Sequence, residues 1–369
     1  ERCVNEGDTV ARLSGDEFTL LLEGTRTPKS IAYTVHEVLE QLSRPYDVDG
    51  RDVFISVCIG VAMYPDHADS ASNLLKRVDT ALNEAKRKGS GNFEFYTSAL
   101  SARIERKLHV ENGLRRALDR GELSLNYQPK VDLRTRRIVG AEVLLRWNSV
   151  EMGSVSPSEF IPIAEETGLI LPIGEWVLRE ACLQVEQWIL SGLPRIKVAV
   201  NLSARQFQDS ALTSRILDIM SETHMDAELL ELELTESMLV ENAEEAIQAL
   251  WALRGLGITL SIDDFGTGYS SLSYLKRFPI DSLKIDQSFV RDIPTNKDDA
   301  AITKAIVSLA KSLDLKIIAE GLEEIAQIEF LASLGCDQGQ GYYFSRPIPA
   351  DDFMREYLVS EAGVVERVG

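Results

Sequence analysis

Strand-like and helix-like segments alternate from Leu123 to about Tyr357, and this alternation limits the folds that the chain can adopt. The apolar, strand-like segments are 123–133, 138–147, 196–202, 229–234, 259–265, 282–285 and 316–319, with a last one near 341–344. Helical segments lie between most of them, at 173–190, 243–256 and 300–313 for example. Repeated βα units predict a TIM-like (β/α) barrel of the α/β class, whose first two strands form a hairpin through 134–137. A doubly wound open sheet is the alternative.

Polar residues stand where several of these strands end. They are Asn201, Glu233, Asp263 with Asp264, Lys284 and Glu320, while Glu142 lies inside the second strand. A barrel collects the carboxyl ends of its strands on one face, so these side chains are expected to converge. Several carboxylates in one pocket need cations, and hard divalent ions take about six oxygen ligands each. For Asp263 and Asp264 alone, the other interpretation is a solvated pair that caps a helix at 269–277.

Composition restricts the kind of partner and of metal. The net charge of -19 argues against a phosphate-neutralising surface for duplex nucleic acid. The four cysteines and four histidines are scattered without zinc-type spacing, so a metal would be held by oxygen ligands, which favours Mg²⁺ or Mn²⁺. No apolar run reaches about 18 residues and no leader segment is recognisable, so we expect a cytoplasmic protein without a membrane segment.

Residues 1–96 form a different pattern, typical of an α+β domain. A hairpin is predicted over 9–13 and 17–23, a helix over 30–43, a strand over 53–64, a helix over 71–87 and a strand over 93–96. Apolar residues at helical spacing then predict a helical linker over 97–120. The expected domains are thus 1–96, the linker, the barrel at 121–358 and a tail at 359–369.

The hairpin carries the motif Arg12-Leu13-Ser14-Gly15-Asp16-Glu17-Phe18, which resembles the signature of GGDEF domains, the diguanylate cyclase family. Later segments, 58–62, 79–82 and 85–92, follow the same family. Ser14 replaces the first motif glycine, the inhibitory R-x-x-D box falls on Asn5-Glu6-Gly7-Asp8 without its arginine, and the family's metal-bearing first strand would lie before Glu1. The resemblance therefore implies a partial GGDEF domain without cyclase activity in this chain. Asp16 and Glu17 either contact a metal and a guanine nucleotide in a longer protein or lie at the hairpin tip without binding a ligand.

The second predicted strand carries Glu142-Val143-Leu144. With Val in place of Ala, this resembles the naming motif of EAL domains, the cyclic di-GMP phosphodiesterase family, and the resemblance covers residues 105–357. The other motifs follow in the family's order: Asn201-Leu202-Ser203, Glu233-Leu234-Thr235-Glu236, Asp263 to Gly268, Lys284-Ile285-Asp286, Ala319-Glu320-Gly321 and Gln340-Gly341-Tyr342.

This resemblance implies roles for individual residues. Glu142, Asn201, Glu233 and Asp263 would bind one metal ion, and Asp263, Asp264 and Glu320 the second. Lys284 would orient or help deprotonate a water that attacks phosphorus, in chemistry that two divalent ions favour. The substrate would be contacted by Gln128, Arg146, Asp286 and Gln340. Glu236 and Glu323 would stabilise the loop 264–271.

The sequence therefore predicts an enzyme that uses two Mg²⁺ or Mn²⁺ ions to open cyclic di-GMP to linear pGpG, with the GGDEF part as regulator. The resemblance also implies a homodimer in a bacterial cytoplasm. Two other hypotheses stay open: an inactive EAL domain that only senses cyclic di-GMP, and a bifunctional cyclase and phosphodiesterase in a longer chain. GTP binding at the GGDEF remnant is left open as well.

Overall fold

The computed structural model describes residues 3, 7–24, 27–240, 243–267 and 272–359. The chain divides into two compact units, Glu1–His109 and Val110–Gly369. The division falls inside helix α3 (Ser98–Ala117), within the segment expected to be a helical linker.

Among its described residues, the first unit contains two complete helices, the first part of α3 and three small pairs of strands. The strands are β1 (Thr9–Ser14), β2 (Glu17–Leu21), β3 (Tyr46–Val48), β4 (Arg51–Val53), β5 (Ile59–Val61) and β6 (Phe93–Phe95), and the helices are α1 (Pro28–Leu42) and α2 (Ala71–Arg87). β1 and β2 form the predicted antiparallel hairpin, and β5 pairs with β6 in parallel. One apolar face of α1, with Ile31, Val35 and Leu39 four residues apart, packs against Val61.

One strand prediction in this unit is wrong. The run 53–64 was expected to be a single strand, but β4 ends at Val53 and β5 begins only at Ile59. Phe54 and Ile55 are exposed, at 71% and 44%, and within the described part of the chain no strand pairs with 54–58. Valine and isoleucine favour strands because their side chains pack well on a half-buried sheet, but a strand forms only where a neighbouring strand is present to pair with it. Residues 5 and 6 of the expected R-x-x-D position lie outside the described residues.

The second unit is a closed barrel, which confirms the predicted fold and excludes the open sheet. Its strands are β7 (Leu123–Asp132), β8 (Ile138–Ser149), β10 (Lys197–Asn201), β11 (Leu230–Thr235), β12 (Thr259–Phe265), β13 (Ser282–Ile285), β14 (Lys316–Ala319) and β15 (Gln338–Gly339). They pair in the order β7-β15-β14-β13-β12-β11-β10-β8, and β8 pairs back with β7. β7 is antiparallel to both of its neighbours, and the other neighbouring strands are parallel. Two short strands, β9 (Gly153–Val155) and β16 (Ile348–Pro349), extend the sheet beside β8 and β7.

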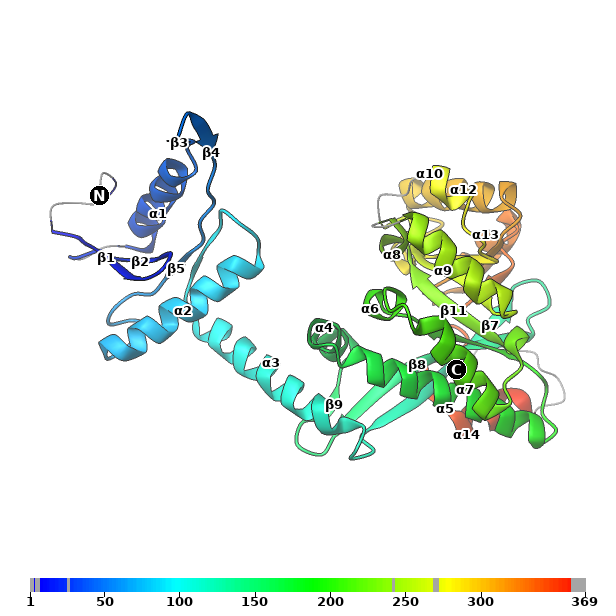
Figure 1. Cartoon of the computed structure of the whole chain (residues 1–369). Helices are drawn as coiled ribbons and strands as arrows, with labels where there is room; N and C mark the ends of the chain where they lie inside the picture. Colours follow the sequence, from blue (N-terminus) through cyan, green and yellow to red (C-terminus); the bar gives the residue numbers. More distant parts are fainter. Residues whose placement is uncertain (1–2, 4–6, 25–26, 241–242, 268–271, 360–369) are drawn as a thin grey trace. The chain divides into compact units, whose positions relative to one another are not determined.

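Helices α5, α7 and α9 cover the outside of these strands (Figure 1). The helical segments described in this unit are α4 (Pro157–Thr167), α5 (Ile170–Leu190), α6 (Ala204–Phe207), α7 (Leu212–Thr223), η1 (Ala227–Leu229), α8 (Glu236–Val240), α9 (Ala243–Gly255), α10 (Leu272–Leu275), α11 (Gln287–Val290), α12 (Lys297–Ser312), α13 (Ile325–Leu334), α14 (Ala350–Phe353) and η2 (Met354–Leu358). Tyr127 of β7 packs edge-on against Trp188 of α5, which stacks on Phe353 of α14. These contacts hold the first strand and the last helices of the barrel together.

The last barrel strand also differs from the prediction. It is β15, at Gln338–Gly339, whereas 341–344 forms a turn that buries Phe344. Gly341 packs directly on the chain at Leu322, and a Cβ there would lie 2.2 Å from the Leu322 backbone N and O. Phe344 is therefore buried without strand pairing, and alternation alone could not distinguish a buried turn from a buried strand here. The helix expected at 269–277 is α10, and 268–271 lie outside the described residues.

Candidate metal centre at the carboxyl ends of the barrel strands

The structure brings the acidic residues of four strands around a single lysine on a fifth. The Lys284 ammonium lies 2.8 Å from Glu233, 2.7 Å from Glu320 and 3.1 Å from Asp263. The carboxylate of Glu142 is 3.8 Å away. These residues leave β13, β11, the end of β14, β12 and β8, so parallel strands deliver them to one end of the barrel, as predicted from strand ends.

Lys284 is completely buried, so its charge depends on these partners. Burial alone would lower the pKa of its ammonium, but Glu142, Glu233, Glu320 and Asp263 raise the pKa well above its ordinary value. The lysine is therefore a fixed positive charge at the centre of the site.

One lysine does not balance the surrounding acids. Burial raises the pKa of Glu320 to about 8, although Lys284 opposes the shift, and Asp263 and Glu142 add to it. The pKa of Glu142 is likewise raised, by burial and by Glu233 and Asp263. By contrast, burial would raise the pKa of Glu233, but Lys130 and Lys284 lower it to about 2. Full ionisation of this cluster therefore needs further positive charge.

Asp263, Asp264 and Glu320 can offer oxygens to one ion. One carboxylate oxygen from each lies within 4.8 Å of the other two. Asp264 is exposed and has a left-handed φ of 52°, which is uncommon outside glycine. Its backbone N–H donates to Asp263 Oδ1 at 2.9 Å, which orients the Asp263 carboxylate.

Asn201 lies beside Glu142. Its Nδ2 donates to Glu142 Oε1 at 2.8 Å, and Asn201 pairs in register with Glu233 on the next strand. The amide donor thus points to a carboxylate, which leaves the amide oxygen as a possible metal ligand.

Gln128 and Gln340 close the other side of the site. The Gln340 side-chain amide donates to Gln128 Oε1 at 2.7 Å and also to Glu142 Oε2. Gln128 in turn donates to the Ser345 carbonyl at 2.9 Å. Gln340 Oε1 is buried without a hydrogen-bond partner among the described residues, so this oxygen can accept from a ligand.

Of the two residues expected to stabilise the loop after β12, Glu236 is the one that contacts the described part of this loop. Glu236 Oε2 accepts from the Gly266 backbone N–H at 3.1 Å. Glu323 is exposed, and its backbone N–H donates to Gln327 Oε1 at 2.8 Å. Residues 268–271 of the loop lie outside the described residues, so the role of Glu323 stays a prediction.

The remaining substrate candidates lie at the edge of the cluster. Asp286 caps α11 through its hydrogen bond from the Ser288 N–H at 2.9 Å. Partial burial, Asp263 and Asp286 raise the pKa of Asp264, so Asp286 faces the acidic pair. Arg146 is half-buried on β8, and burial lowers the pKa of its guanidinium while Tyr342 and Glu142 oppose that shift. Tyr342 and Glu142 therefore both lie near this guanidinium.

Sequence reasoning missed two buried charged residues below this cluster. Lys130 of β7 reaches across the barrel to Glu231 at 2.9 Å and to Glu233 at 2.7 Å. A lysine between Pro129 and Val131, inside an apolar strand, is the signal that could have found it. Glu231 stands two residues before Glu233 and so faces the same side of β11.

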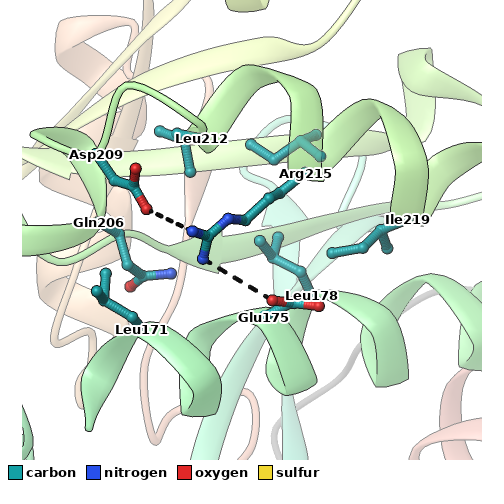
Figure 2. A pocket seen from close by; sticks show the side chains of 9 residues that line it. Leu171, Glu175, Leu178, Gln206, Asp209, Leu212, Arg215 and Ile219 are labelled. Atoms are coloured by element: carbon teal, nitrogen blue, oxygen red, sulfur yellow. Dashed lines mark ion pairs between the residues drawn. The ribbon is translucent and has the colours of Figure 1, made fainter. Parts of the chain in front are cut away.

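A separate concavity between α5 and α6–α7 has a different character. Figure 2 shows Arg215 between Asp209 and Glu175, at 3.1 and 4.0 Å. Its charges are paired with each other, and Leu171, Leu178 and Leu212 supply apolar walls (Figure 2). None of the residues predicted for the site lines this concavity.

The acidic pair of the first unit forms no comparable site. Asp16 and Glu17 are exposed at the turn of the β1–β2 hairpin, which Arg12 braces through its bond to the Gly15 carbonyl at 2.8 Å. Among the described residues, the carboxylates that gather closely enough for a metal are those of the barrel. No described helix is both long and apolar enough to cross a membrane.

Comparison with known proteins matches both parts of the chain to families. Residues 111–347 match the EAL domain, and residues 1–92 match the diguanylate cyclase, GGDEF domain. MucR of Pseudomonas aeruginosa, a bifunctional diguanylate cyclase/cyclic di-GMP phosphodiesterase, is 42% identical over 351 residues, which cover 95% of this chain and 51% of that protein. PdeR of Escherichia coli, a cyclic di-GMP phosphodiesterase, is 38% identical over 355 residues, which cover 96% of this chain and 53% of that protein. The chain thus spans about half the length of these relatives.

Solved structures agree with this assignment. The PaMucR phosphodiesterase in complex with c-di-GMP is 46% identical, with a TM-score of 0.65 over 66% of this chain and 99% of that one. The cGMP-bound EAL enzyme Bd1971 is 35% identical, with a TM-score of 0.65 over 79% of this chain and 76% of that one. The closed barrel, the acidic cluster at its strand ends and these matches together show that the chain belongs to the EAL domain family and carries a GGDEF domain before its EAL domain.

Proposed function

We propose that the barrel unit is a metal-dependent phosphodiesterase that hydrolyses cyclic di-GMP to linear pGpG. The observation that carries this proposal is the convergence of Glu142, Glu233, Asp263 and Glu320 on Lys284. The proposed substrate follows from the relatives: MucR and PdeR are named as cyclic di-GMP phosphodiesterases, and the PaMucR phosphodiesterase structure is a complex with c-di-GMP.

The donor set fits hard divalent cations. Five carboxylates, those of Glu142, Glu233, Asp263, Asp264 and Glu320, stand around one ammonium. When all are ionised they leave four negative charges, which two divalent ions would balance. Every donor is an oxygen, the ligand type that Mg²⁺ and Mn²⁺ take. Glu142, Asn201, Glu233 and Asp263 would hold one ion, and Asp263, Asp264 and Glu320 the other.

The reaction adds water to a phosphodiester phosphorus and breaks one ester bond. The ions, when bound, would supply Lewis acidity for the phosphoryl oxygen and for the attacking water. The broken bond leaves a 5′ phosphate on one nucleoside, and the released 3′ oxygen takes a proton. Lys284 remains charged, so it is suited to orienting the water and stabilising negative charge by hydrogen bonds. Arg146, at the edge of the cluster, offers paired donors to a phosphate oxygen.

The first unit acts, in this proposal, as a regulator of the barrel. Ser14 at the hairpin and the exposed Asp16 and Glu17 favour this role over catalysis. GTP as its ligand, a homodimer and a bacterial cytoplasmic location belong to the same proposal. They rest on the family resemblance and on bacterial relatives such as MucR and PdeR.

Product analysis tests the proposal. The full chain is incubated with cyclic di-GMP and Mg²⁺ or Mn²⁺, and the nucleotides are separated by chromatography. Accumulation of pGpG that stops on addition of EDTA is expected. Intact cyclic di-GMP after long incubation, with binding still measurable, would favour the sensor. GTP turnover by a chain extended before Glu1 would establish the bifunctional enzyme.

A further inference from the structure

Lys130 and Glu231 form a charged pair directly below the candidate metal centre. Both are buried, with 3% and 7% of their side chains exposed, and their charged atoms lie 2.9 Å apart. β7 and β11 are not adjacent in the barrel, so Lys130 crosses the interior to reach its partners. Such a buried pair seldom adds net stability over apolar residues, so its presence in a barrel interior suggests another use.

The pair acts on Glu233, whose two carboxylate oxygens have different neighbours. Oε1 accepts from Lys130 at 2.7 Å, and Oε2 accepts from Lys284 at 2.8 Å. Lys284 also contacts Asp263 and Glu320, so Oε2 is the oxygen that faces the other acids. Lys130 thereby fixes which oxygen of Glu233 is presented to the candidate metal centre.

A lysine in this position has a cost that Glu231 removes. An uncompensated ammonium so close to Glu233 would repel a divalent cation through the low-dielectric interior. Glu231 provides the opposite charge at 2.9 Å, so the pair as a whole is neutral. The cluster above it can then keep its full negative charge for cations.

We propose that Lys130 and Glu231 are positioning residues for metal binding: Lys130 holds Oε1 so that Glu233 binds a metal through Oε2 alone, and Glu231 cancels the Lys130 charge. This inference rests on the proposed metal centre. Two consequences follow from it. Removing the Glu231 charge alone weakens metal binding, because the positive charge of Lys130 is then no longer neutralised. Removing both charges restores the charge balance below the metal centre, but Glu233 Oε1 then loses its hydrogen bond from Lys130.

The test compares Mn²⁺ affinity of the full chain by isothermal titration calorimetry without substrate. The variants are Glu231→Gln and the double variant Lys130→Met with Glu231→Gln. The Glu231→Gln variant is expected to bind Mn²⁺ about 10- to 100-fold more weakly than wild type, as is typical for loss of an outer partner of a ligand. The double variant is expected to lie between the two.

The control is Glu222→Gln, which removes one negative charge from an exposed ion pair with Arg179 at 3.0 Å. It is expected to bind Mn²⁺ as wild type does, so it separates the local effect from net charge. A double variant that binds no better than Glu231→Gln, or Glu231→Gln at wild-type affinity, overturns the inference. Should Glu231→Gln not fold, wild-type affinity in the double variant overturns it. No Mn²⁺ binding by the wild type would instead reject the metal centre itself.

Discussion

Two acidic pairs in this chain, one in each unit, have almost the same local sequence chemistry and very different surroundings. Asp263 and Asp264 end a buried strand, and Asp263 lies 3.1 Å from the Lys284 ammonium. Asp16 and Glu17 lie at the turn of a two-stranded hairpin and are exposed. Water solvates the second pair, whereas the buried Asp263 depends on cations and hydrogen bonds, although Asp264 beside it is exposed. An acidic dipeptide therefore becomes a candidate metal site through the strands that converge on it.

Asp263→Asn gives the largest expected effect on the barrel side of this comparison. Turnover of cyclic di-GMP should fall by about 1,000-fold or more, because stabilisation by metal ions is worth several kcal/mol and about 1.4 kcal/mol is tenfold in rate. Binding of labelled cyclic di-GMP should persist. Unchanged turnover would remove Asp263 from the metal-binding set.

Lys284→Met tests whether the central ammonium is part of the machinery. We expect kcat to fall by about 10²- to 10³-fold, as for loss of a hydrogen-bond donor that stabilises developing negative charge. The acids around it would also lose their internal counter-charge. Thermal unfolding with and without Mn²⁺ should then show a larger stabilisation by the ion than in wild type. Equal stabilisation in both proteins would argue that Lys284 does not balance this cluster.

Glu236→Ala and Glu323→Ala compare the two residues predicted to hold the loop after β12. The first removes the acceptor of the Gly266 N–H, and we expect kcat to fall by about 10- to 100-fold. The second removes an exposed side chain and should have the smaller effect. Steady-state kinetics with both variants decides the order. A larger loss of kcat for Glu323→Ala would show that Glu323 matters more for this loop than the Glu236 hydrogen bond to Gly266.

Gly60→Ala separates the stability of the two units. A Cβ at Gly60 would lie 2.3 Å from the Val78 carbonyl oxygen and 2.4 Å from the Leu82 N, both backbone atoms of α2. Overpacking of this kind costs about 1–3 kcal/mol, so the first unit should unfold at lower temperature. Differential scanning calorimetry should show the barrel transition unchanged. A shift of the barrel transition by the same amount would mean that the units unfold together.

Asp16→Asn with Glu17→Gln is the counterpart of Asp263→Asn and should have the smallest effect. Exposed substitutions of this type change stability by about 0.5 kcal/mol or less. The number of Mn²⁺ ions bound per chain, measured by calorimetry, should equal that of wild type. A lower number would place a metal at the hairpin and break the contrast between the two acidic pairs.

Much of the barrel could be predicted because its signals are local. A buried strand that ends in Glu233 or Lys284 combines apolar periodicity with a polar residue at a defined place. The strand at 341–344 was misplaced because Phe344 is buried in a turn, and burial looks the same along the sequence in either case. The strand expected over 53–64 failed for the opposite reason, since Phe54 is 71% exposed and none of the described strands pairs with it.

The partners of Lys130 could not be predicted from the sequence. Its own strand predicts only that a lysine is out of place among apolar residues. Its partners lie 101 and 103 residues further along the chain, on a strand that is not its neighbour. The distance between these residues is set by closure of the sheet, which no local pattern records.

By itself, the sequence determined the alternation of strands and helices, the residues at the strand ends and therefore the existence of an acidic site. Hydrophobic periodicity and turn chemistry act between near neighbours, so they can be recognised along the chain. Tertiary structure alone decided that Lys284 lies among four carboxylates and that Lys130 donates a hydrogen bond to one oxygen of Glu233. The physical reason is that buried charges are stable only beside partners within a few ångströms, and the folding of distant strands into one barrel fixes which partners those are.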